Sequence, residues 1–194
     1  MHSSLRVMAP FLFVLAIAAC GKAPVAVPPT PPPAAQLQGP KPVASILDLM
    51  SGQLAPTSEL LWNAVGTTSG PKGAIEKRPH TDADWAELRR QAMILAEAAN
   101  LLAVEGREVA HPDQKYLNPP GPGDLPPAKS QALIAAERPT WLAYALVLQG
   151  SALATIKAID ARDVDAFTEA GGAIDEACEQ CHKKFWYPEA PKVP

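Results

Sequence analysis

Residues 81–102 read TDADWAELRRQAMILAEAANLL, the clearest helical pattern in the chain. The apolar residues recur in alternating steps of three and four, which is the spacing of one face of an α-helix that packs on other helices. Thr81 and Asp84 are spaced like a capping box, with aspartate in the place of glutamate. The segment therefore predicts a helix with a buried stripe of Trp85, Leu88, Ala92, Leu95, Ala99 and Leu102.

Three other segments have an apolar stripe of the same kind. The first covers residues 43–65 and is expected to kink or break at Pro56, because proline cannot continue the hydrogen-bond ladder. The second begins near Pro127 and continues from Pro139, and the third covers about residues 164–185. The predicted inward residues are Val43, Ile46, Leu47, Met50, Leu54, Leu61 and Val65, then Trp141, Tyr144, Leu148, Ala152, Thr155 and Ile159, then Phe167, Ala170, Ile174, Cys178, Cys181 and Phe185.

Four such stripes predict an all-α fold, an antiparallel four-helix bundle over residues 43–187. No stretch alternates with period two for long enough to suggest a sheet. The connection over about residues 105–128 is rich in proline and longer than bundle loops usually are, so it is expected to cover part of the core or a cofactor. Residues 188–194 are expected to form a flexible tail.

The N-terminus has the pattern of an export signal. Arg6 precedes an apolar stretch over residues 7–19 that is too short to span a bilayer comfortably. The sequence Ile-Ala-Ala-Cys at 17–20 resembles the lipobox of bacterial lipoproteins, which predicts a signal peptide over residues 1–19 and lipidation of Cys20. The alternative is an ordinary secretory signal with a coincidental cysteine.

Residues 20–42 are rich in proline and alanine and predict a tether between the lipid and the folded domain. The mature chain is thus expected in the periplasm, held on a membrane by its acyl chains. In lipoproteins of this kind, Lys22 rather than aspartate after Gly21 favours the outer membrane. The formal net charge of −3 is too small to indicate a nucleic-acid partner.

The sequence Cys178-Glu179-Gln180-Cys181-His182 has the C-x-x-C-H pattern of covalent haem attachment. Residues three and four apart share one face of a helix, so the two thiols can meet the vinyl groups of one haem while the imidazole binds the iron. The alternatives are a disulfide, a redox pair and half of a zinc site. A redox pair normally lies at the start of a helix, and no second Cys or His pair lies nearby to complete a zinc site.

The segment from Trp141 to Phe185 resembles the C-terminal half of the cytochrome c prime class, the four-helix c-type cytochromes. The shared features are a long third helix that ends near Asp160, Asp-x-x-Ala-Phe at 163–167, a run of small residues, and Cys-x-x-Cys-His-x-x-Phe at 178–185. The chain departs from the class at Trp186, where many members have arginine. The aromatic cluster that begins at Phe185 could shield the haem or close the bundle.

The resemblance also suggests a sixth iron ligand. In low-spin members of the class a methionine of the first helix has this role, which the resemblance assigns to Met50. The alternative is a methionine that only fills the core. Met93, His80 and His111 are weaker candidates, and Arg89, Arg90 and Lys183 could pair with the haem propionates.

The resemblance therefore implies a haem c protein without enzymatic activity, which carries one electron between redox proteins of the bacterial cell envelope. It also implies a homodimer, because relatives often pair through their first two helices. The alternative function is a five-coordinate haem protein that binds or senses nitric oxide or carbon monoxide. A haem-dependent peroxidase ranks last, because no inward His or Arg is evident to assist the cleavage of an oxygen bond.

Overall fold

The computed structural model describes residues 41–71, 73–114, 121 and 123–188. The predicted signal peptide, Cys20, nearly all of the tether and nearly all of the tail lie outside these residues. The described chain is mostly helical, as predicted, with one small sheet. Its elements are α1 (Ile46–Leu49), the π-helix η2 (Met50–Leu54), α2 (Ala55–Trp62), β1 (Gly66–Gly70), β2 (Gly73–Lys77), α3 (Asp82–Leu102), α4 (Pro127–Ala136), α5 (Arg138–Ala161) and α6 (Val164–Phe185).

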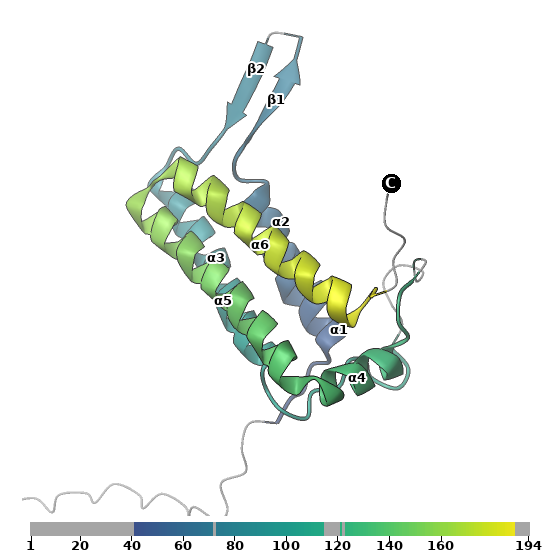
Figure 1. Ribbon diagram of the computed structural model, residues 1–194. Helices are drawn as coiled ribbons and strands as arrows, with labels where there is room; N and C mark the ends of the chain where they lie inside the picture. The colour runs from purple at the N-terminus through teal and green to yellow at the C-terminus, as the bar shows by residue number, and fades with distance from the viewer. Residues whose placement is uncertain (1–40, 72, 115–120, 122, 189–194) are drawn as a thin grey trace, which may run out of the picture. The chain divides into compact units, whose positions relative to one another are not determined.

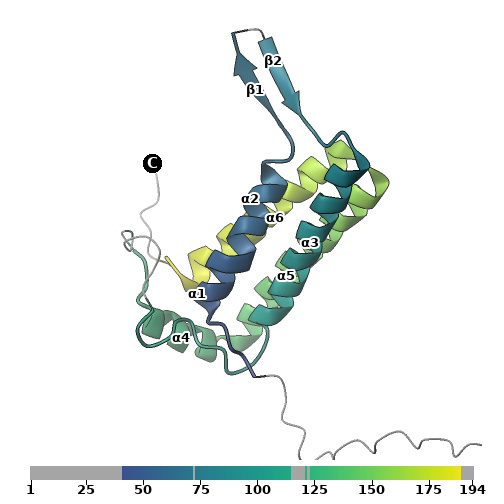
Figure 2. The same ribbon diagram turned by 180° about the vertical axis from the view of Figure 1, so that it is seen from behind.

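The longer helices pack along one another. Helix α5 contacts both α3 and α6, and α2 contacts both α3 and α6. Opposite views show α1 and α2 alongside α6, and α3 alongside α5 (Figures 1 and 2). The short helix α4 lies at one end of this group and the two strands extend from the other (Figure 1). By length and composition α5 could cross a membrane, but here it packs against its two neighbours.

Helix α3 has the boundaries and the buried face that its sequence predicts. All six residues of its predicted stripe are buried. At its start the capping box is complete, since the Asp84 amide donates to Thr81 Oγ1 over 3.1 Å and the Thr81 amide donates to Asp84 Oδ2 over 2.9 Å. Aspartate therefore serves in the place of glutamate in this box.

The capping carboxylate makes a testable contribution to stability. Backbone hydrogen bonds from His80 and Thr81 hold the pKa of Asp84 below its ordinary value. Because the pKa is lowered in the folded state, Asp84 stabilises the fold above its unfolded pKa, and this contribution is lost as the pH falls through the folded value. We expect Asp84→Ala to destabilise the protein in urea at neutral pH, and the difference from wild type to shrink in acid.

The uncharged half of the same box provides the control. Thr81→Ala is expected to cost about 1 kcal/mol, with a loss that persists in acid because a hydroxyl does not titrate. An equal loss for Asp84→Ala at neutral and acid pH would contradict a role for the charged carboxylate.

The first predicted helix continues past its proline. Pro56 cannot donate a backbone hydrogen bond, and η2 lies directly before α2, with the Ala55 amide donating to the Met50 carbonyl five residues back. The chain thus passes Pro56 through a π-turn without a break. The predicted stripe was wrong at Val43, which precedes the helix with 85% of its surface exposed. Val65 follows the helix but packs against the core in a partly buried position.

The hairpin of β1 and β2 corrects the prediction that the chain has no sheet. The strands are antiparallel, with Thr68 opposite Ile75. Nearly all their residues are exposed, so no buried face imposes an apolar residue at every second position. Gly73, with φ of 107°, provides a backbone conformation at the turn that other residues rarely adopt.

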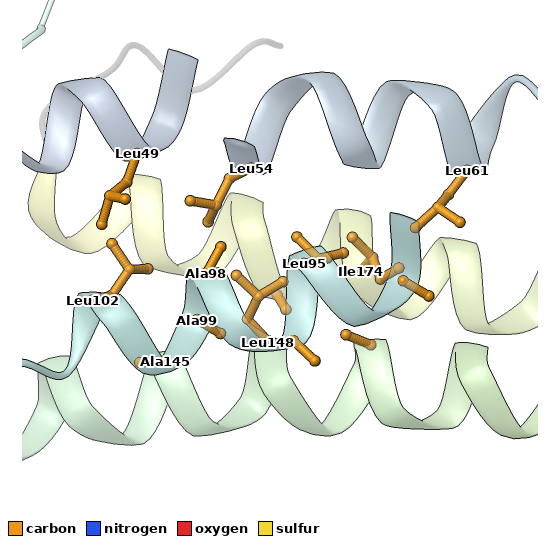
Figure 3. Packing of buried hydrophobic residues seen from close by; sticks show 14 of the residues in the cluster. Leu49, Leu54, Leu61, Leu95, Ala98, Ala99, Leu102, Ala145, Leu148 and Ile174 are labelled. Carbon is orange, nitrogen blue, oxygen red and sulfur yellow. The ribbon is translucent and has the colours of Figure 1, made fainter. Parts of the chain in front are cut away.

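The hydrophobic core lies between the long helices. Leu49, Leu54 and Leu61 extend from the first helical segment toward Leu95 and the other core residues of α3 (Figure 3). Small residues let the backbones approach closely where the larger side chains interdigitate. The labelled members from α3, α5 and α6 are Leu95, Ala98, Ala99, Leu102, Ala145, Leu148 and Ile174 (Figure 3).

The connection after α3 covers the beginning of α1. The buried Arg107 donates to the carbonyls of Leu101 and Ala44, which ties the end of α3 to the entry of α1. The Ile46 amide donates to the Glu108 carbonyl over 2.9 Å. The described part of this connection therefore covers part of the core, where Val109 is buried. Val109, Gln114 and Asp124 also line the cavity of the candidate functional site, so coverage of a cofactor stays a prediction.

Candidate functional site

Helix α6 presents the C-x-x-C-H residues on one face. Asp163 caps its start by accepting a hydrogen bond from the Ala166 amide over 3.0 Å, and the helix then runs to Phe185 without interruption. Cys178, Cys181 and His182 lie in its last two turns, three and four residues apart. All three line the same cavity.

This cavity has a volume of about 540 Å³. It lies within the range of about 300–1,000 Å³ that is usual for sites that bind small molecules and cofactors. Residues of α1, η2 and α2 form one wall, and α6 forms another. Its aromatic and aliphatic lining includes Trp62, Leu54, Leu102, Ile134, Trp141, Tyr144, Leu148 and Phe185.

The two cysteines are free thiols in half-buried positions. Burial raises the pKa of Cys178 to about 11 and that of Cys181 to about 12. Both groups are therefore protonated at neutral pH, whereas a redox pair usually has a thiol with a lowered pKa. The surroundings of these thiols favour a structural or cofactor-anchoring role over redox exchange.

His182 is also partly withdrawn from water. Burial lowers its pKa, although the nearby Glu179 carboxylate acts in the opposite direction. The neutral imidazole is thus favoured, and this is the form that binds a metal ion. Its ring is held by an edge contact with Trp186, with ring centres 5.0 Å apart.

Met50 lines the same cavity as His182, on the wall formed by the first helical segment. It is half-buried and packs against the core. Met93 instead lies on the outside of α3 with 42% of its surface exposed, and its sulfur accepts a hydrogen bond from Arg89. Of the two methionines considered as ligands, Met50 is the one that lines the cavity.

The two other histidine candidates have surface positions. The His80 amide donates to Asp84 beside the cap of α3. His111 Nε2 lies 3.2 Å from Asp48 Oδ2 and its Nδ1 lies 3.8 Å from Glu108. Neither side chain is among the described residues of the cavity wall.

Comparison with family models, with curated proteins and with solved structures finds no match for this chain. The sequence motif and the cavity are therefore the features from which we infer a function.

The basic residues expected near haem propionates have other partners. Arg89 binds Asp160 over 2.8 Å, Arg90 binds Glu87, and Lys183 Nζ lies 3.1 Å from Glu179. None of the three basic residues is among the described residues that line the cavity. The charged groups that do line it are carboxylates and the titratable His182, and the carboxylates are Asp48, Glu59 and Asp124.

The aromatic residues Phe185 and Trp186 at the end of α6 line the cavity, and one of them also packs into the core. Phe185 is buried and makes edge contacts with Trp141 and Tyr144, with ring centres 5.2 and 6.1 Å apart, which closes this end of the core. Trp186 lines the cavity beside His182. Phe185 thus closes the bundle, as one of the two predicted alternatives has it, and shielding of a haem by this cluster stays a prediction.

One residue of the cavity wall could not be recognised in the sequence. Ser58 lies on α2 and lines the cavity. Its hydroxyl oxygen is buried and has no hydrogen-bond partner, which is true of no other buried side-chain nitrogen or oxygen in the described part of the chain. In the sequence, a helical serine whose hydroxyl has no partner looks the same as one whose hydroxyl bonds to its own backbone. The sequence alone therefore could not single out Ser58.

Proposed function

We propose that the chain is a c-type cytochrome of the cytochrome c prime class that carries one electron between redox proteins of the bacterial cell envelope. The observation that carries this proposal is the position of Cys178, Cys181 and His182 together on the wall of one apolar cavity. In this proposal α1–η2–α2, α3, α5 and α6 are the four members of an antiparallel bundle. The contacts of α5 and α2 with both α3 and α6 support it.

The residues around the cavity fit the demands of a covalently attached haem. Cys178 and Cys181 would hold the ring edge through thioether bonds, and His182 would bind the iron. Met50 would provide a second iron ligand from the facing segment. When bound, haem supplies a single-electron couple between ferrous and ferric iron, while the chain supplies an apolar enclosure and fixed ligands.

The N-terminal sequence supports a function at a membrane surface. The predicted export signal supports the proposal, because attachment of haem c takes place outside the cytoplasm, where the attachment apparatus keeps the thiols reduced. Lipidated Cys20 would hold the domain on the periplasmic side of a membrane, with the outer membrane as our preferred location. The partners would be other redox proteins of the envelope, and the cytochrome class implies a homodimer.

A second candidate function is capture of a small gas such as nitric oxide or carbon monoxide by five-coordinate iron. The aromatic and aliphatic lining of the cavity favours it, because such a wall accommodates an uncharged diatomic molecule. Met50 distinguishes the two functions. A methionine bound to the iron competes with the gas and favours electron transfer.

Optical spectra of the full-length, haem-loaded protein test the choice between these functions. We expect oxidised and reduced wild type to have the bands of six-coordinate haem and to react poorly with carbon monoxide. Met50→Ala should become five-coordinate and bind carbon monoxide readily. Its reduction potential should fall, because an axial methionine raises the potential of haem iron.

Met93→Ala is the matched control, since it removes an exposed methionine that is not among the described residues lining the cavity, and its spectra should equal those of wild type. Met50→Ala that remains six-coordinate would exclude Met50 as the ligand. A wild type that is already five-coordinate would favour gas binding. Protein without haem absorbance, made together with the attachment apparatus, would overturn both functions.

A further inference from the structure

The Ser58 hydroxyl is a buried polar group without a partner on the cavity wall. Only 2% of the residue's surface is exposed, and its oxygen has no hydrogen-bond partner within the described chain. An unbonded hydroxyl in an apolar enclosure costs free energy, so proteins normally pair such groups. This makes Ser58 a position where a partner from outside the polypeptide is expected.

Neighbouring hydroxyls on the same helical segment find partners in their own backbone. Thr57 Oγ1 donates to the Gln53 carbonyl over 2.5 Å, and Ser51 Oγ donates to the Leu47 carbonyl over 2.8 Å. Ser51 lines the cavity as Ser58 does, yet its hydroxyl is already engaged. Ser58 therefore differs from its neighbours in having a donor available to whatever occupies the cavity.

The polar groups of a bound haem are its two propionates, since its vinyl groups are used in the thioether bonds. A carboxylate inside an apolar cavity needs hydrogen-bond donors. The described part of the cavity wall contains no Lys or Arg, and the basic residues expected in this role bind Asp160, Glu87 and Glu179 instead. On the α2 wall, the group available to donate a hydrogen bond to a propionate is therefore an uncharged hydroxyl.

We propose that Ser58 donates a hydrogen bond from its hydroxyl to a haem propionate. This inference rests on the proposed attachment of haem to Cys178 and Cys181. It makes Ser58 a positioning residue, which stabilises the ionised propionate and fixes the rotation of the ring edge. It assigns no part in iron ligation to Ser58.

Infrared difference spectra between the reduced and oxidised haem-loaded protein test the contact directly, with isotope-labelled propionate carboxyls to identify their bands. We expect Ser58→Ala to shift one propionate band. Ser58→Thr, which keeps the hydroxyl, should retain the wild-type band position. A parallel experiment measures the reduction potential as a function of pH, which reports the pKa of the propionate. A donated hydrogen bond lowers a carboxylate pKa, so this pKa should rise by about one unit in Ser58→Ala.

Ser51→Ala is the matched control, because it removes a cavity-lining hydroxyl that is bonded to its own backbone. Both variants keep the titratable groups that face the cavity, so these groups cannot explain a difference between them. They are Asp48 from α1, Glu59 from α2, Asp124 from the connection before α4, Tyr144 from α5 and His182 from α6. Cys178 and Cys181 also face the cavity, but in the haem-loaded protein they would be thioethers and would not titrate.

The intact mass of each protein distinguishes a failure of the Ser58 contact from a failure of haem attachment. Haem mass on Ser58→Ala together with unshifted propionate bands would overturn the role of Ser58 and leave the proposed function in place. Equal shifts in Ser58→Ala and Ser51→Ala would also overturn it. Wild type without haem mass would overturn both.

Discussion

Replacement of both Cys178 and Cys181 by alanine is expected to abolish covalent haem attachment. Both thiols line the cavity and are free, so each is available for a thioether bond. A thioether survives unfolding, whereas haem held only through His182 dissociates when the cavity unfolds. Denatured wild type should thus carry the mass of one haem and denatured double variant none, as measured by intact mass and by haem staining of denaturing gels.

Cys20→Ala is the control for this experiment, since it removes the third cysteine of the chain. We expect it to keep the haem mass and to lose the lipid mass, because Cys20 is the predicted site of lipidation. Haem that remains on the denatured double variant would falsify attachment at Cys178 and Cys181. A Cys20→Ala protein that keeps a lipid would contradict lipidation at Cys20.

The helical part of this fold could be predicted because its apolar residues recur with the helical period. The boundaries of α6 and the six buried residues of α3 follow from that period, and Thr81 marks the start of α3. The hairpin could not be predicted in the same way. Its residues are exposed on both faces, so burial leaves no periodic trace in the sequence.

The part of the candidate site that lies on one helix could be predicted from the spacing of its residues in the sequence. Cys178, Cys181 and His182 are close in sequence, and one helix is enough to bring them to one face. Met50 and Ser58 join them only through packing of distant segments. A π-turn before Pro56 also shifts the faces of the first helical segment, and the spacing of apolar residues does not encode that shift.

Replacement of Phe167 by alanine is expected to cause the largest loss of stability among the substitutions proposed here. Phe167 is 1% exposed and contacts the edge of the Trp85 ring, with centres 6.4 Å apart. Removal of a buried phenyl ring loses its transfer free energy and leaves a cavity, which together cost about 3–5 kcal/mol. Urea denaturation of the haem-loaded protein should show this loss as a lower midpoint.

Replacement of Phe167 tests the stability of the core without changing a residue of the cavity wall. It is not among the described residues that line the cavity, so its replacement should leave the haem spectrum of the folded protein unchanged. Leu146→Ala is the control, because Leu146 is 62% exposed on α5 and its loss should change stability by less than about 0.5 kcal/mol. Similar midpoints for the two variants would contradict a core that depends on the contact between α3 and α6 at Phe167.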